Sequence, residues 1–124
     1  MKKTDTLGMA QRGGSVVSEV RFGARVYSPL APERGADYVI ALDDREGLRN
    51  AYRLRDDGRP VNVPPELHEQ LGDPRARNMA ALGRLSPSLD VDAELWHEAI
   101  RRCMPPRSVE VNLAAFEAGR AFRE

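Results

Sequence analysis

A chain of 124 residues is long enough for one domain with a single hydrophobic core. Its 19 basic and 19 acidic residues cancel to a formal charge of zero, which excludes the strong positive field expected of a protein that binds nucleic acid or an anionic membrane. The single cysteine, Cys103, excludes an internal disulfide and an iron–sulfur cluster on this chain, and its helical context predicts a buried thiol. No apolar run could span a membrane and residues 1–7 do not form a signal peptide, so we expect a cytoplasmic protein.

The most informative stretch is a polar, glycine-rich loop placed directly before an alternating strand. The loop residues expected to meet a ligand or a partner are Met9, Ala10, Gln11, Arg12, Gly13, Gly14 and Ser15. The two glycines allow another backbone to approach closely, and the polar side chains supply hydrogen-bond donors and acceptors. Residues 16–22 then alternate with period two, with Val20 and Phe22 on one side and Glu19 and Arg21 on the other, as in a half-buried strand. A turn at Gly23-Ala24 predicts a hairpin with residues 25–28.

The next segment has the pattern of a strand followed at once by a helix. The apolar run over residues 36–42 predicts a strand covered on both faces, as in a parallel sheet between helices. Asp43 is the expected N-cap of the helix, and Glu46 completes a capping-box-like pair. The inward stripe of this helix is expected to hold Leu48, Ala51 and Tyr52. Residues 55–60 predict a loop, and residues 61–63 predict a short strand.

The second half of the chain predicts helices over residues 65–71, 75–82, 93–103 and 109 to about 123. Asp73, Asp92 and Ser108 are the expected N-caps of the last three helices. We expect Val91 to pack onto Trp96 as a hydrophobic staple. The expected inward residues are Ala76, Met79, Leu82, Trp96, Ile100, Cys103, Val109, Leu113 and Phe116. A strand–helix unit followed by helices places the chain in the α/β class.

Residues with obvious catalytic chemistry are few. His68 and His97 lie in separate helical patterns, without a nearby nucleophile or metal-ligand spacing, so we expect half-buried or surface histidines without a catalytic role. The carboxylates at 43–44, 56–57, 90 and 92 fall where caps and turns favour them. No complete phosphate-binding motif occurs, although the loop before residue 16 could hold an anion with its backbone N–H groups.

A family resemblance extends over nearly the whole chain. The segment KKTDTLGMAQRGGSVVS at residues 2–18, with its continuation to residue 37, resembles the γ subunit or domain of the 2-oxoacid:ferredoxin oxidoreductases, nearest to the indolepyruvate-type branch. The later pieces NMAALG (78–83) and SVEVNLAAFEAGR (108–120) are similar to that family in the same order. The resemblance implies a partial doubly wound sheet with a β-hairpin and C-terminal helices, formed by residues 1–124 as a single domain truncated by its N-terminal β-α unit. Glu19 stands where the family usually has a histidine.

The resemblance implies an accessory subunit, or a fragment of one, that is not catalytic alone. The whole complex would decarboxylate indolepyruvate or a related 2-oxoacid and pass electrons to ferredoxin. Thiamine diphosphate, magnesium and iron–sulfur clusters would sit on partner chains and none on this one, with residues 9–15 facing the thiamine-bearing partner or, as a second choice, a ligand like CoA. The alternatives are a free-standing small-molecule or anion-binding α/β module, and a start codon placed too far downstream. A sheet without its first unit exposes a strand edge, so self-association of the isolated chain is also expected.

Overall fold

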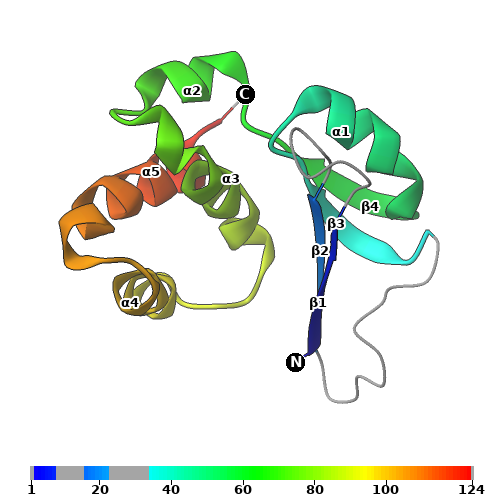
Figure 1. The fold of residues 1–124 in the computed structure, drawn as a ribbon, viewed down its shortest axis with the longest axis horizontal. Coiled ribbons are helices and arrows are strands. Elements are labelled where there is room, and N and C mark those ends of the chain that lie inside the picture. The colour runs from blue at the N-terminus through cyan, green and yellow to red at the C-terminus, as the bar shows by residue number, and fades with distance from the viewer. Residues whose placement is uncertain (1, 8–15, 23–33, 124) are drawn as a thin grey trace. The chain divides into compact units, whose positions relative to one another are not determined.

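The computed structural model describes residues 2–7, 16–22 and 34–123 of the chain. Contacts divide the chain into two compact units, Met1–Val39 with Leu48–Arg59 and Ile40–Gly47 with Pro60–Glu124. Strands occupy the first half of the sequence and helices dominate the second (Figure 1). The α/β class predicted from the sequence is therefore confirmed.

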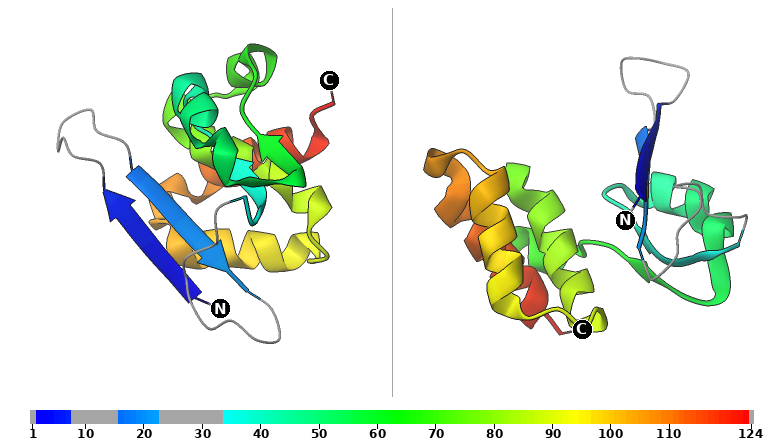
Figure 2. Two further views of the ribbon diagram at one scale, coloured as in Figure 1. Left: turned by 90° about the vertical axis from the view of Figure 1, so that its right-hand side faces the viewer. Right: turned by 90° about the horizontal axis from the view of Figure 1, so that it is seen from below.

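The first sheet consists of β1 (Lys2–Leu7) and β2 (Val16–Arg21), which pair antiparallel. The register sets Lys2 opposite Arg21 and Leu7 opposite Val16, and Figure 2 shows the two strands side by side and pointing in opposite directions. The predicted strand over residues 16–22 is thus confirmed. The predicted hairpin partner at residues 25–28 lies outside the described residues.

The side of β2 that faces solvent carries the apolar residues Val20 and Phe22. In a half-buried strand the apolar side is usually the covered one. Val20 is 51% exposed and Phe22 is 61% exposed, whereas Glu19 and Arg21 on the opposite side are half-buried. The physical reason is an ion pair between Glu19 and Arg53 that holds the polar side of the strand inward. Alternation identified which residues share a side, but it could not identify which side is covered.

The second sheet consists of β3 (Ala36–Ile40) and β4 (Leu54–Val61). The strands run in the same direction, because the Ala36 carbonyl lies close to Gly58 while the Ala41 N–H donates to the Val61 carbonyl at 2.9 Å. This matches the parallel sheet expected from the apolar run at residues 36–42. The expected burial of that run on both faces is wrong, because Ile40 and Leu42 at its end are exposed.

The connection between these strands contains α1 (Asp44–Asn50) and a 3₁₀ turn, η1 (Ala51–Arg53). The Asp43 carboxylate accepts hydrogen bonds from the N–H groups of Arg45 at 2.8 Å and Glu46 at 3.2 Å, which confirms the predicted N-cap.

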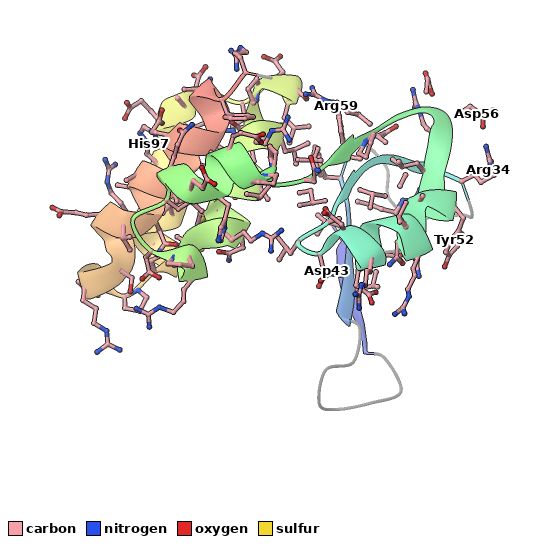
Figure 3. The ribbon with its side chains drawn as sticks, turned by 90° about the horizontal axis from the view of Figure 1, so that it is seen from above. Arg34, Asp43, Tyr52, Asp56, Arg59 and His97 are labelled. Atoms are coloured by element: carbon pink, nitrogen blue, oxygen red, sulfur yellow. The ribbon has the colours of Figure 1, made fainter. Side chains whose placement is uncertain are left out.

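The predicted inward stripe of α1 is wrong. Leu48 is 81% exposed, Tyr52 is 48% exposed, Ala51 is exposed as well, and α1 has no buried residue. Figure 3 shows Asp43 and Tyr52 at opposite ends of this short helix. The spacing of apolar residues marks the side that a neighbour would cover, and in this chain that side is left open to solvent.

The predicted loop at residues 55–60 is also wrong, since these residues belong to β4. Arg55 donates to Asp37 of β3 at 2.6 Å, which links the two strands through their side chains. Gly58 lies so close to the Ala36 carbonyl that an added Cβ would be 3.0 Å from the oxygen. Pairing with β3 therefore overrides the turn preference of an Asp-Asp-Gly sequence.

The rest of the chain is helical. The elements are α2 (Pro65–Gln70), η2 (Pro74–Ala76), α3 (Arg77–Leu85), η3 (Ser86–Ser88), α4 (Ala93–Cys103), η4 (Pro106–Ser108) and α5 (Val109–Ala121). The four predicted helices are confirmed, and α4 has the predicted bounds. The Asp73 side chain accepts from the Arg75 N–H as an N-cap, whereas the side chains of Asp92 and Ser108 make no capping hydrogen bond.

The burial predicted for Cys103, at the end of α4, is wrong. Cys103 is exposed, because it is the last residue of the helix and lies beyond the core that Ile100 reaches. Val91, just before the helix, is 38% exposed, and its staple onto Trp96 stays a prediction. The middle of the helix follows the prediction, since Ile100 is buried and Trp96 is half-buried.

The buried core lies in the helical unit. Its apolar residues are Val61, Val63, Leu67, Ala76, Ala80, Ala81, Leu85, Ile100, Ala115 and Phe116. Helices α3 and α5 pack side by side in Figures 1 and 2, and they cross at two glycines, Gly83 and Gly119. Among the described residues of the first unit whose exposure is defined, none is buried.

Candidate functional site

The predicted interface loop joins the two strands of the first sheet. Its residues, Met9 to Ser15, lie outside the described residues. The structure does place both flanks of the loop, because Leu7 and Val16 are Cα partners at the end of the β1–β2 ladder. The loop thus begins and ends at neighbouring points of one antiparallel sheet. Its role in binding stays a prediction.

A polar network links β2 to the turn after α1. The Arg53 guanidinium donates to Glu19 at 2.8 Å through Nη1 and to Asn50 at 2.8 Å through Nε. The same guanidinium lies 5.2 Å from the centre of the Tyr52 ring, within range of a cation–π contact. Glu19 and Arg53 have side chains only 13% and 29% exposed, so water screens this pair less than an ion pair on the open surface.

The second oxygen of the Glu19 carboxylate, Oε2, is buried and has no hydrogen-bond partner among the described residues. Leaving a buried acceptor unpaired costs about 1–3 kcal/mol, so this site gains from any donor that reaches it. Sequence reasoning did not find the network, because 34 positions separate Glu19 from Arg53.

A second group of charges lies at the surface of the β3–β4 sheet. Arg55 forms ion pairs with both Asp37 and Asp57. Arg34 forms an ion pair with Asp56, and both residues are labelled in Figure 3. The hydrogen bond from Arg55 lowers the pKa of Asp57, and the bond to Asp57 raises the pKa of Arg55. Each of the three carboxylates in this group, those of Asp37, Asp56 and Asp57, is therefore held by an arginine.

The two histidines lie on different helices and do not form a site together. His68 is on α2, while His97 on α4 pairs with Glu117 of α5 and sets its ring edge against Phe116 at a centroid distance of 5.9 Å. Both are half-buried, as expected from the sequence. Among residues 17–22 and 34–123, whose side chains the structure describes, no group of three histidine, cysteine or carboxylate side chains could hold a metal ion.

The helical unit has a small and mostly apolar groove between the end of α2, η2 and α5. Its lining includes Leu71, Ala76, Val111, Ala115 and Ala118. The polar residues at its rim are Gln70 and Asp73, and Asp73 is already engaged with Arg75. The groove therefore offers packing for an apolar side chain and has no convergent polar groups for a polar substrate. No helix in the described part of the chain is long and apolar enough to cross a membrane.

Comparison with known families gives a single clear result. A family model described as pyruvate ferredoxin/flavodoxin oxidoreductase matches residues 1–122. The chain belongs to this family. The resemblance drawn from residues 2–18 and from the two later motifs is thereby confirmed.

The similar curated proteins of this family carry one name, indolepyruvate oxidoreductase subunit IorB. The protein from Pyrococcus horikoshii is 30% identical over 90% of this chain and 75% of its own length. The protein from Archaeoglobus fulgidus is 34% identical over 93% of this chain and 76% of its own length. These alignments run over 152 and 154 positions, more than the 124 residues of this chain, so each relative has residues inside the matched region that this chain lacks.

The two later motifs of this family member have a structural explanation. NMAALG lies on α3 and VEVNLAAFEAG lies on α5, and they meet where the helices cross. A Cβ on Gly83 would lie 2.0 Å from the Phe116 carbonyl oxygen, and a Cβ on Gly119 would lie 2.0 Å from that of Ala80. These motifs therefore serve helix packing, and the motif without such an explanation is the one around the loop before β2.

Proposed function

We propose that this chain acts as a non-catalytic docking subunit of a 2-oxoacid:ferredoxin oxidoreductase. The observation that carries the proposal is the family match over residues 1–122, together with relatives that are named as subunits of an oxidoreductase. The described residues support a docking role because several of their charged groups, such as Glu19 with Arg53 and Asp73 with Arg75, are held in structural ion pairs. They do not converge on a cavity where a 2-oxoacid could react.

The cofactors of such an enzyme belong, in this proposal, to the partner chains. An iron–sulfur cluster takes about four cysteine thiolates, and this chain has a single cysteine, which is exposed at the end of α4. The residues present therefore do not fit a cluster. Thiamine diphosphate and magnesium are likewise assigned to the partner that carries out decarboxylation. The substrate of the whole enzyme is indolepyruvate or a related aryl or branched 2-oxoacid, by analogy with the named relatives.

The proposed contact is the loop of residues 9–15, which leads directly into β2. Two adjacent glycines permit a partner backbone to approach, and Arg12 supplies five N–H donors for carboxylate or carbonyl groups. A partner protein is favoured over a phosphate-bearing ligand, because the sequence has no complete phosphate-binding motif.

Co-expression with the thiamine-binding oxidoreductase chain of the same organism tests this function. We expect a stable complex that contains thiamine diphosphate and iron, and 2-oxoacid-dependent reduction of ferredoxin that falls when this chain is left out. A chain that remains free of the thiamine-binding partner and instead binds nucleotides as a monomer would contradict the proposal. That result would favour the free-standing ligand-binding module.

A further inference from the structure

Helix α4 is less firmly packed than the two helices it accompanies. Of its 11 residues only Ile100 is buried, whereas α3 buries four residues and α5 buries three, among them the fully buried Phe116. Helices α3 and α5 also cross so closely that a Cβ on Gly83 or Gly119 would meet backbone atoms. An element that buries little apolar surface opens at a lower free energy than the core around it. We therefore expect α4 to separate before α3 and α5 do.

The aromatic and ionic contacts between α4 and α5 lie at one place, around Phe116. The Trp96 ring lies 5.8 Å from the Phe116 ring centre at a tilt of 35°, and the His97 ring meets Phe116 edge-on at 5.9 Å. His97, labelled in Figure 3, also pairs through Nε2 with the carboxylate of Glu117, the next residue of α5. The hydrogen bond from Arg102 stays within α4, because its acceptor is Glu98. The His97–Glu117 pair is thus a latch between the two helices.

Both ends of α4 can act as hinges. The helix follows Asp92 and precedes Met104, and both of these residues have extended backbone. The Asp92 side chain makes no capping hydrogen bond to the start of the helix. A change of φ and ψ at such terminal residues turns a helix as a rigid body and leaves its internal hydrogen bonds intact.

The closed position of α4 leaves one polar group unpaired. Trp96 Nε1 is buried and has no hydrogen-bond partner among the described residues. A buried donor without an acceptor costs free energy, and water recovers this cost when the group becomes exposed. The apolar contacts of Ile100 and Phe116 therefore favour the closed position, whereas the Trp96 N–H favours the open one.

We propose that α4 is a hinged lid over Phe116, latched by His97 and Glu117, and that it opens while α3 and α5 stay packed. Opening uncovers the Phe116 ring on α5. It leaves the crossing at Gly83 and Gly119 intact, because backbone atoms of α3 and α5 alone make that contact.

Native-state hydrogen exchange of the full chain, read by mass spectrometry at low urea concentrations, tests the lid. We expect amide hydrogens of α4 to exchange at least about tenfold faster than those of α3 and α5, after correction for their intrinsic rates. Exchange of all three helices in one common opening would overturn the proposal.

Removing the latch tests the role of its two residues. Glu117→Ala changes an exposed residue and should speed exchange in α4 by about fivefold, the scale of one hydrogen bond, while α3 and α5 keep their rates. Glu110→Ala is the matched control, because Glu110 is exposed on the same helix, and it should leave exchange in α4 unchanged. His97→Leu keeps an apolar side chain beside Phe116 and is the second latch variant if Glu117→Ala does not fold. A folded latch variant with unchanged exchange in α4, or with equal acceleration of all three helices, overturns the proposal.

Discussion

The crossing of α3 and α5 makes Gly119→Ala the sharpest test of the packing described above. The new Cβ would lie 2.0 Å from the Ala80 carbonyl oxygen, whereas ordinary contact begins at 3.4 Å, so the helices must move apart by more than an ångström. A gap of this width between the helices removes roughly a quarter to a half of the dispersion energy of the atoms that line it.

The expected net loss follows from two opposing effects. Overpacking typically costs about 1–3 kcal/mol, and because the new Cβ meets backbone we take the upper end, about 3 kcal/mol; the better helix propensity of alanine returns about 1 kcal/mol. We therefore expect the free energy of unfolding to fall by about 2 kcal/mol, which lowers the melting temperature by roughly 10 °C for a unit of this size.

Urea and thermal unfolding followed by circular dichroism measure this loss. Gly72→Ala is the matched control, because a Cβ at Gly72 meets nothing within 4 Å, and we expect it to change stability by less than about 0.5 kcal/mol. Adding Gly83→Ala to Gly119→Ala should cost less than the sum of the single changes, since both separate the same helices. A Gly119→Ala protein as stable as the wild type would refute the close crossing.

Three further changes test other parts of the structure. Arg53→Met leaves the half-buried Glu19 carboxylate unpaired and should destabilise the chain by about 1–3 kcal/mol in urea unfolding, and adding Glu19→Gln should recover part of this loss. The hydrogen bond from Arg75 lowers the pKa of Asp73 below its ordinary 3.8. The ionised Asp73 side chain therefore contributes its full stabilisation above pH 3.8, and this stabilisation is lost as the pH falls through the lower pKa of the folded state. Asp73→Asn should flatten this part of an acid-unfolding curve, and an unchanged curve would contradict the role of Asp73 as a cap. Arg12→Ala should weaken assembly with the thiamine-binding chain in a pull-down titration while the melting temperature stays within about 1–2 °C, and a large loss of stability with normal assembly would reject the interface role.

The sequence predicted the helical half of the chain well because its signals there are local. Asp73 followed by Pro74, and Asp92 before an amphipathic run, mark helix starts within a few residues. The resulting helices have the expected positions, and α4 has the expected ends. The side that faces the core was also predictable for Ile100 and Phe116, because enough neighbouring helix surface exists to cover them.

Predictions from the sequence were wrong or missing where the structure depends on residues that are far apart in the chain. Residues 55–60 contain the polar and glycine residues of a turn, and they form a strand because β3 lies beside them. Leu48 was expected to point inward, and nothing in the described structure covers it. The Glu19–Arg53 pair, which decides the orientation of β2, joins residues 34 positions apart and has no local signature. The loop at residues 9–15 was found only as a motif, and its role stays a prediction.

The buried residues are concentrated between Val61 and Gly119, and this affects which parts of the chain unfold locally. Amide hydrogens in α3 and α5 should exchange with solvent only through global unfolding, whereas those in β2 should exchange through openings of much lower free energy. Hydrogen exchange read by mass spectrometry measures this difference, and equal protection of β2 and α5 in the free chain would contradict it. Proteases that act on locally opened chain should therefore cut the free protein in β2 well before they cut α3 or α5.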